Sequence, residues 1–279
     1  MPTHLPAHLC GIDFSGDSNM WNRRCGRSNV WIAEGTQEGE RVRLKSLRQV
    51  QSFDGDLTPF RSLSAYLSSG IVDYAAIDAP FSLPKDYLQG NAEEAWKAVT
   101  ELPVEKRHFP SGEALVSLFA SDLLPRGKKV LRETESYWKT NGVNVRSTLW
   151  NGPRGGAPFT AACMTLLGYH RGSVWPIRDT GGTTLVEAFP AAQLKQWQME
   201  YNGYNGDTTE AILARELIIT GLLTKGLCAD THLIDLCRKS ADALDAVVCL
   251  FSASATAKGI TAVQPGEYSR VEGHICVHQ

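Results

Sequence analysis

Acidic residues stand repeatedly at the ends of apolar strands or within an apolar helix of this sequence. Asp13 ends the run LCGID, Asp78 ends YAAID and Glu187 follows TLV, while Asp242 and Asp245 lie in ADALDAVVCLFSA. A carboxylate buried beside Ile, Leu and Val costs several kcal/mol unless it is paired, protonated or bound to a cation. The economical explanation for all these positions is a fold that gathers them around one shared metal site.

The segments around the acidic residues predict an α/β fold. Three strands, at 8–15, 28–34 and 41–48, follow one another so closely that they favour an antiparallel meander. A helix over 57–69, followed by the strand that ends at Asp78, implies a crossover to a parallel neighbour. The later elements that the pattern predicts are a strand at 183–189 and helices over 207–223 and 240–257.

The middle of the chain differs from both ends. Residues 85–182 contain helical patterns near 111–124, 130–139 and 158–168, separated by prolines and the turn-rich NGPRGGAP. We interpret this stretch as a mostly helical insertion that could act as a lid. A length of 279 residues, 43% of them hydrophobic, accommodates one large α/β domain, so we expect a single domain over 1–279 with this insertion inside it.

Composition and charge exclude several classes of protein. The formal net charge of −2 provides no overall attraction for nucleic acid, which counts against a role confined to DNA binding. No apolar run approaches the roughly 20 residues that cross a bilayer, and the N-terminal sequence does not resemble a signal peptide. Seven scattered cysteines without a CxxC pair are typical of reduced thiols. We expect a cytoplasmic protein without a membrane partner, of an oligomeric state that the sequence does not reveal.

The residues themselves suggest a chemistry. Metal-assisted phosphodiester hydrolysis uses two Mg²⁺ or Mn²⁺ ions roughly 4 Å apart, and these hard cations prefer oxygen ligands. Asp13 could bridge both ions and Asp78 could bind one. Asp242 and Asp245 are three residues apart, on one side of a helix, so either could complete the site. Glu187 is the natural fourth ligand or water-orienting base. The substrate would be a nucleic acid or a nucleotide.

Each acidic residue also has a purely structural interpretation. Asp13 could accept hydrogen bonds from turn amides, and Asp78 precedes Ala-Pro, as a residue that starts a turn often does. Asp242 follows a plausible N-cap and could merely complement the helix dipole. Glu187 could pair with an arginine such as Arg154 or Arg178. One shared site remains the simpler explanation for all of them.

Other polar residues are candidates for binding a substrate. Ser15 could donate a hydroxyl after the first strand, and Arg154, before Gly155-Gly156, could clamp a phosphate. His274, Cys276 and His278 alternate and could in principle bind Zn²⁺. A basic cluster is better explained as a solvated helix face, and it consists of Arg126, Lys128, Lys129 and Arg132.

Five short motifs resemble a known family. They are GIDFSG, IDAPFSLP, VEAFPAA, DALDAVVCLFSA and EGHICV, within residues 8–90 and 183–278. In kind and order they resemble the predicted nucleases catalogued as domain of unknown function 429, which implies a ribonuclease H-like mixed sheet flanked by helices. Many members carry an arginine followed closely by an acid in the middle segment, and the nearest match is Arg132 with Glu135 in LRETES.

The resemblance also implies where the metal ligands lie. A ribonuclease H-like fold favours carboxylates on the first strand, the fourth strand and the last helix, which are here Asp13, Asp78 and Asp245 or Asp242. We therefore expect a metal-dependent phosphodiester hydrolase. Two other functions fit the same pattern: a nucleotide-dependent phosphotransferase of actin-like topology, which would need a second phosphate loop, and a non-catalytic binding module. Binding of a divalent cation separates the hydrolase from the binding module.

Overall fold

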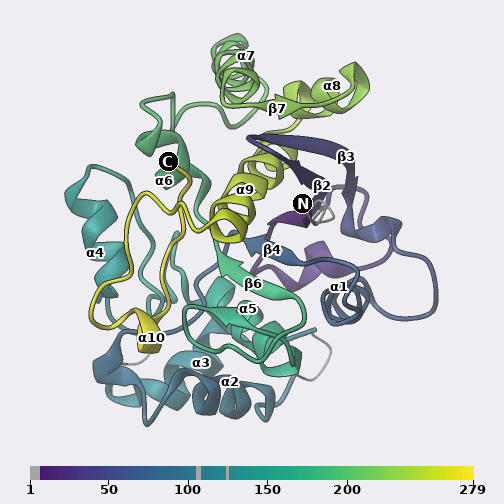
Figure 1. Cartoon of the computed structure of the whole chain (residues 1–279). Helices are drawn as coiled ribbons and strands as arrows, with labels where there is room; N and C mark the ends of the chain where they lie inside the picture. Colours follow the sequence, from purple (N-terminus) through teal and green to yellow (C-terminus); the bar gives the residue numbers. More distant parts are fainter. Residues whose placement is uncertain (1–6, 105–107, 124–125) are drawn as a thin grey trace.

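The computed structural model describes residues 7–104, 108–123 and 126–279, and its centre is a mixed β-sheet (Figure 1). Seven strands of the described residues form this sheet in the order β5-β6-β4-β1-β2-β3-β7. Strand β2 is antiparallel to β1 and β3, whereas β4, β5, β6 and β7 run parallel to their neighbours. The strands are β1 (His8–Asp13), β2 (Trp31–Glu38), β3 (Arg41–Gln49), β4 (Tyr74–Ile77), β5 (Val174–Trp175), β6 (Thr184–Glu187) and β7 (Leu227–Cys228).

Helices cover both faces of the sheet, and an apolar core lies between the sheet and the helices on each face. Figure 1 shows α9 on one side of the strands and α5, α2 and α3 on the other. The first layer contains α6 (Pro190–Gln196), α7 (Thr209–Thr224), α8 (Thr231–Lys239) and α9 (Ala241–Lys258). The second contains α1 (Pro59–Leu67), α2 (Ala92–Thr100), α3 (Gly112–Phe119) and α5 (Ala157–Tyr169). The remaining helices are α4 (Glu133–Thr140), α10 (Ser269–Glu272) and the short 3₁₀ turns η1 (Ser18–Trp21), η2 (Val50–Ser52), η3 (Lys85–Tyr87) and η4 (Ser121–Leu123).

Helix α9 lies directly against the central strand β1. Ser240 caps its first turn by accepting a hydrogen bond from the Ala243 amide, and Gly259 ends it in a left-handed conformation. Gly11 permits the close approach, since a Cβ there would lie 2.1 Å from the Ala246 carbonyl oxygen of α9. The start of α9 is thereby brought near the end of β1, where Asp13 stands.

The predicted α/β class is confirmed, including the antiparallel meander of the first three strands. The edge strands β5 and β7 were not predicted, because two residues are too few to show an alternating pattern. Residues 85–182 contain α2 to α5 among the described residues, and they also contribute β5 to the sheet. The stretch that the sequence suggests as an insertion therefore contributes a strand to the sheet.

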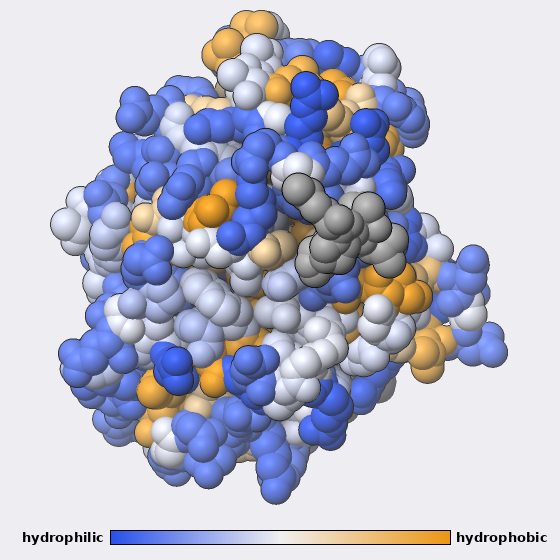
Figure 2. Space-filling model, viewed as in Figure 1, coloured by the Kyte–Doolittle hydropathy of each residue, from blue (hydrophilic) through white to orange (hydrophobic). Residues whose placement is uncertain are grey.

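Two further features concern the surface and the thiols. No helix among the described residues has the length and apolar character needed to cross a membrane. The seven cysteines are free. Figure 2 shows apolar surface at the top of the molecule, where α7 lies in Figure 1, and the exposed apolar side chains of α7 are Ile212, Leu213, Leu217 and Leu223.

Candidate active site

A cavity of about 470 Å³ lies where β1, β4 and β6 end and α9 begins. Its lining includes Asp13 from β1, Asp78 just after β4, Glu187 at the end of β6, and Asp242 and Asp245 from α9. The carboxyl ends of parallel strands meet at one edge of a sheet, which explains why residues so far apart in sequence face one cavity. The structure thus brings together all five acidic residues that the sequence singled out.

Burial and neighbouring negative charges raise the pKa of three of these carboxyls. Burial, and then the negative charges of Asp245 and Asp78, hold the pKa of Asp13 well above its ordinary value. Burial raises the pKa of Asp78 to about 7, with Arg146 opposing the rise and Glu187 adding to it. Burial and Asp78 likewise raise the pKa of Asp245. Among the described residues none of the three forms an ion pair, so the cavity concentrates negative charge.

The two acidic residues of α9 differ in their surroundings. Asp242 lies in the first turn, where a carboxylate also complements the helix dipole, and burial raises its pKa. Asp245 lies one turn deeper and accepts a 2.8 Å hydrogen bond from the Tyr204 hydroxyl, which moderates the rise in its pKa. Both line the cavity, so both remain candidate ligands, with Asp245 the more firmly oriented.

The oxygen donors that line the cavity are of the type that a hard divalent cation prefers, but the described side chains are not positioned to coordinate one. The lining offers carboxylate oxygens, and the buried Oδ1 of Asn29 has no hydrogen-bond partner among the described residues. Yet no group of three or more His, Cys, Asp or Glu side chains in the described part of the chain is positioned to hold an ion. The carboxyls face one cavity without forming a finished coordination shell. The same finding applies to His274, Cys276 and His278.

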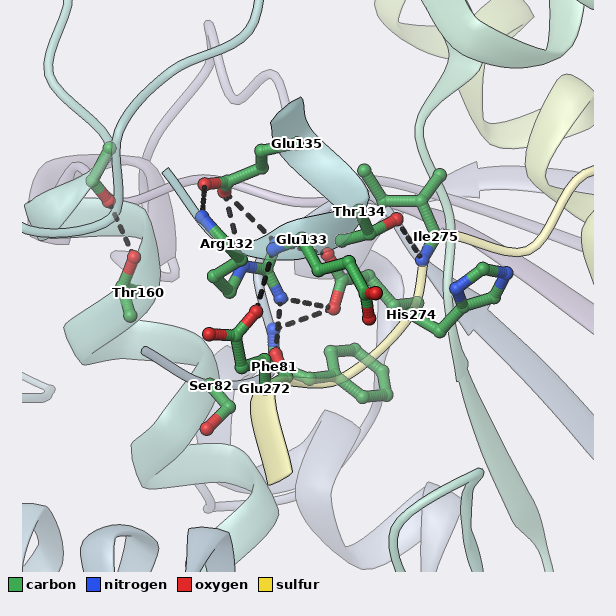
Figure 3. A network of polar contacts seen from close by, with 12 residues as sticks. Phe81, Ser82, Arg132, Glu133, Thr134, Glu135, Thr160, Glu272, His274 and Ile275 are labelled. Atoms are coloured by element: carbon green, nitrogen blue, oxygen red, sulfur yellow. Dashed lines mark hydrogen bonds and ion pairs between the residues drawn. The ribbon is translucent and has the colours of Figure 1, made fainter. Parts of the chain in front are cut away.

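Glu187 belongs to a buried ion-pair network around Arg132, and Figure 3 shows Arg132 with Glu135 in this network. Arg132 donates to both of its carboxylate oxygens, at 2.8 and 2.5 Å, and the Phe81 amide donates to Oε2 at 3.1 Å. The same guanidinium donates to Glu135 at 3.0 and 3.2 Å and to the Glu272 carbonyl at 2.8 Å. Arg132 is 1% exposed and Glu187 is also 1% exposed, so the charges are satisfied by one another and not by water.

This network corrects two expectations. Glu187 pairs with Arg132, not with Arg154 or Arg178, and Arg178 instead pairs with Glu93. Arg132 does not belong to a solvated helix face, because it immediately precedes α4 and points into the core. The only signal in the sequence was the arginine and acid of LRETES, which local charge patterning could not separate from the neighbouring exposed lysines.

The two predicted substrate-binding residues lie outside this cavity. Ser15 is buried, and its hydroxyl accepts from the Asp17 amide as part of a local turn. Arg154 is exposed, with a positive φ of 56°. Neither residue lines the cavity in the described structure.

The sequence pattern does not indicate the other polar residues of the cavity wall. They include Arg146, whose segment connects α4 to α5, and Tyr204, whose segment connects α6 to α7. Buried Arg215 of α7 fixes the second segment by donating to the Tyr204 and Gly206 carbonyls at 2.6 and 2.8 Å. Loop residues carry no periodic pattern, so only the three-dimensional arrangement identifies them.

Comparison with known proteins identifies the family of this chain but no individual relative of known function. A family model described as "Protein of unknown function (DUF429)" matches residues 11–270. No curated protein and no solved structure matches the chain significantly. The matched residues include all five acidic residues of the cavity.

Proposed function

We propose, on the premise that the chain belongs to the DUF429 family of proteins of unknown function, that the acidic cavity is the active site of a metal-dependent phosphodiester hydrolase, a nuclease in the broad sense. The single observation that carries this proposal is that Asp13 of β1, Asp78 just after β4 and Asp245 of α9 line one cavity and form no ion pair with any described residue. Such a cluster is costly unless protons or metal ions neutralise it.

A ribonuclease H-like architecture is part of this proposal. The sheet places an antiparallel meander, β1 to β3, beside the parallel strands β4 and β6, and α9 lies against β1. Carboxylates on the first strand, the fourth strand and the last long helix agree with the ligand positions that this fold favours. This agreement supports Asp13, Asp78 and Asp245 as ligands.

We assign different roles to the residues of the cavity. Asp13, Asp78 and Asp245, with Asp242 beside them, would hold Mg²⁺ or Mn²⁺. When bound, the ion supplies charge neutralisation for the phosphate and lowers the pKa of a water molecule. Tyr204 orients Asp245 through its hydrogen bond. Arg132 already occupies both oxygens of Glu187, so we assign Glu187 the role of orienting water and not that of an ion ligand.

The test is divalent-ion binding together with hydrolysis. Isothermal titration with Mn²⁺ should detect binding that Asp13→Asn abolishes. Asp56→Asn, which removes an exposed acid outside the cavity, should leave binding unchanged. Hydrolysis of bis(p-nitrophenyl) phosphate should require Mn²⁺ or Mg²⁺ and should fall at least about a hundredfold in Asp13→Asn, as for the loss of a residue central to electrostatic stabilisation. Absence of Mn²⁺ binding by the native chain would refute the proposal.

A non-catalytic binding module is the second candidate. It is favoured by one observation, that the described residues do not form a finished coordination shell. A binding module need not bind Mn²⁺ at all, and mutation of its carboxylates would alter partner affinity without affecting any hydrolysis. The titration with Mn²⁺ therefore separates the two functions directly.

A further inference from the structure

One wall of the acidic cavity carries an arginine that forms no ion pair with any described residue. The cavity contains two arginines, Arg132 and Arg146, among its described lining residues. Arg132 is fully engaged with Glu187 and Glu135. The Arg146 side chain forms no hydrogen bond or ion pair with any described residue, and it is exposed at the rim. Arg146 is thus the arginine available to an incoming anion.

The structure around Arg146 holds it in place. Its guanidinium lies over the Phe159 ring, 5.1 Å from the ring centre, a geometry that restrains the side chain. The next residue, Ser147, accepts a 3.0 Å hydrogen bond from the Gly156 amide through its carbonyl. The Ser147 hydroxyl also donates to the Val130 carbonyl at 2.6 Å. The backbone is therefore anchored on two sides while the guanidinium faces the cavity.

Arg146 lies close to the acidic residues that would carry the reaction. Its charge acts on Asp78 and opposes the burial-driven rise in the pKa of that carboxyl. Arg146 and Asp78 both line the cavity, so a phosphate held by Arg146 would share the cavity with Asp78. A guanidinium binds two phosphate oxygens at once, and it offsets the repulsion that the neighbouring carboxylates exert on a phosphodiester.

We propose that Arg146 is the phosphate-binding residue of this site and that its substrate is a phosphodiester carried by a flexible single strand of nucleic acid. The proposal rests on the hydrolase function above and identifies its substrate class. A cavity of about 470 Å³ is of the size that holds one nucleotide-sized ligand, and a single strand can place one unstacked nucleotide in it, whereas the bases of a duplex are paired and stacked. The rim adds neutral groups suited to a base: Asn144, Tyr201, Asn202 and Asn205.

Fluorescence anisotropy of a labelled oligonucleotide tests this assignment on the full chain. The probe is a ten-nucleotide single strand, measured with Ca²⁺ in place of Mn²⁺ so that cleavage does not interfere, and a duplex of the same sequence is measured in parallel. Arg146→Ala should weaken single-strand binding by about tenfold or more, the effect expected for losing one charge-assisted contact, and Arg146→Lys should recover part of it. The matched control is Arg154→Ala, an exposed arginine of the same connecting segment that lies outside the cavity.

The outcomes separate this inference from the proposed function. If Arg146→Ala and Arg154→Ala bind the single strand equally well, Arg146 is not the phosphate-binding residue. If the duplex binds more tightly than the single strand, the substrate class is wrong. If Arg146→Ala loses binding but the native chain hydrolyses no phosphodiester with Mn²⁺, the binding site stands and the hydrolase proposal fails. Unchanged melting temperatures of the exposed-site variants exclude an effect through folding.

Discussion

Tyr204 is the side chain that fixes the orientation of Asp245. Its hydroxyl donates a 2.8 Å hydrogen bond to Asp245 Oδ1 and thereby moderates the rise in the pKa of that carboxyl. Tyr204→Phe removes the donor, so protons should compete better with a divalent ion at Asp245. We expect the Mn²⁺ affinity at pH 7 to fall about tenfold, as for other residues that orient metal ligands, and isothermal titration measures it.

The control for this prediction lies on the same loop. Tyr201 lines the cavity as well, but its hydroxyl forms no hydrogen bond with a described residue, and Tyr201→Phe should change the Mn²⁺ affinity by less than about twofold. Raising the pH should restore part of the affinity of Tyr204→Phe, because it removes the competing proton. A pH-independent loss would show that Tyr204 acts through packing alone.

Arg132 is the residue on which the buried network depends. Replacing it by alanine leaves Glu187 and Glu135 buried without a cation, and breaking a buried pair in this way costs roughly 3–5 kcal/mol. Urea unfolding should show this loss for Arg132→Ala. Lys139→Ala, at an exposed position of the adjacent α4, should stay within about 0.5 kcal/mol of the native chain. A loss below about 1 kcal/mol for Arg132→Ala would mean that water enters and replaces the guanidinium.

At the scale of the elements, the packing of α9 against β1 determines where the carboxyls meet. A methyl group at Gly11 would lie 2.1 Å from the Ala246 carbonyl oxygen and 2.6 Å from the Leu250 amide nitrogen. Both atoms belong to the backbone of α9, so Gly11→Ala should push the helix away and destabilise the protein by about 1–3 kcal/mol or more. It should also weaken Mn²⁺ binding, because Asp245 moves with the helix.

Gly26→Ala is the matched control for this packing prediction. A methyl group at Gly26 meets no atom within 4 Å. Urea unfolding of this variant should therefore match that of the native chain to within about 0.5 kcal/mol. If Gly11→Ala were equally stable and bound Mn²⁺ normally, contact between α9 and β1 would not be what positions the acidic residues.

The sequence predicts the elements that carry a periodic signal and the residues attached to them. Asp13 and Asp78 stand at strand ends, and Asp245 lies in a long apolar helix, so the rule that parallel strands end at one edge is enough to expect them near one another. Arg132 and Arg146 stand in irregular connections. Whether such a residue points inward depends on contacts with distant segments, for example between Arg132 and the Glu272 carbonyl, which no local pattern encodes.

At the scale of the whole molecule, a net charge of −2 conceals a strong concentration of negative charge in one cavity. The pKa of Asp78 is about 7, and those of Asp13 and Asp245 are raised well above their ordinary value. In the unfolded chain these groups ionise near pH 4. Between pH 4 and about 7 the folded state therefore holds more protons than the unfolded state, and stability falls as the pH rises.

This linkage predicts that the native chain in EDTA melts at a progressively lower temperature, relative to Asp13→Asn, as the pH rises from 5 to 8. Comparing the two proteins cancels the groups that they share, such as the buried histidines. Millimolar Mn²⁺ should then raise the melting temperature of the native chain by several degrees at pH 8 and leave that of Asp13→Asn unchanged, because an ion that binds only the folded state stabilises it. The gain should shrink toward pH 5, where protons already neutralise the cavity. An equal response of both proteins to Mn²⁺ at every pH would mean that the ion binds elsewhere and that the acidic cavity is neutralised by protons alone.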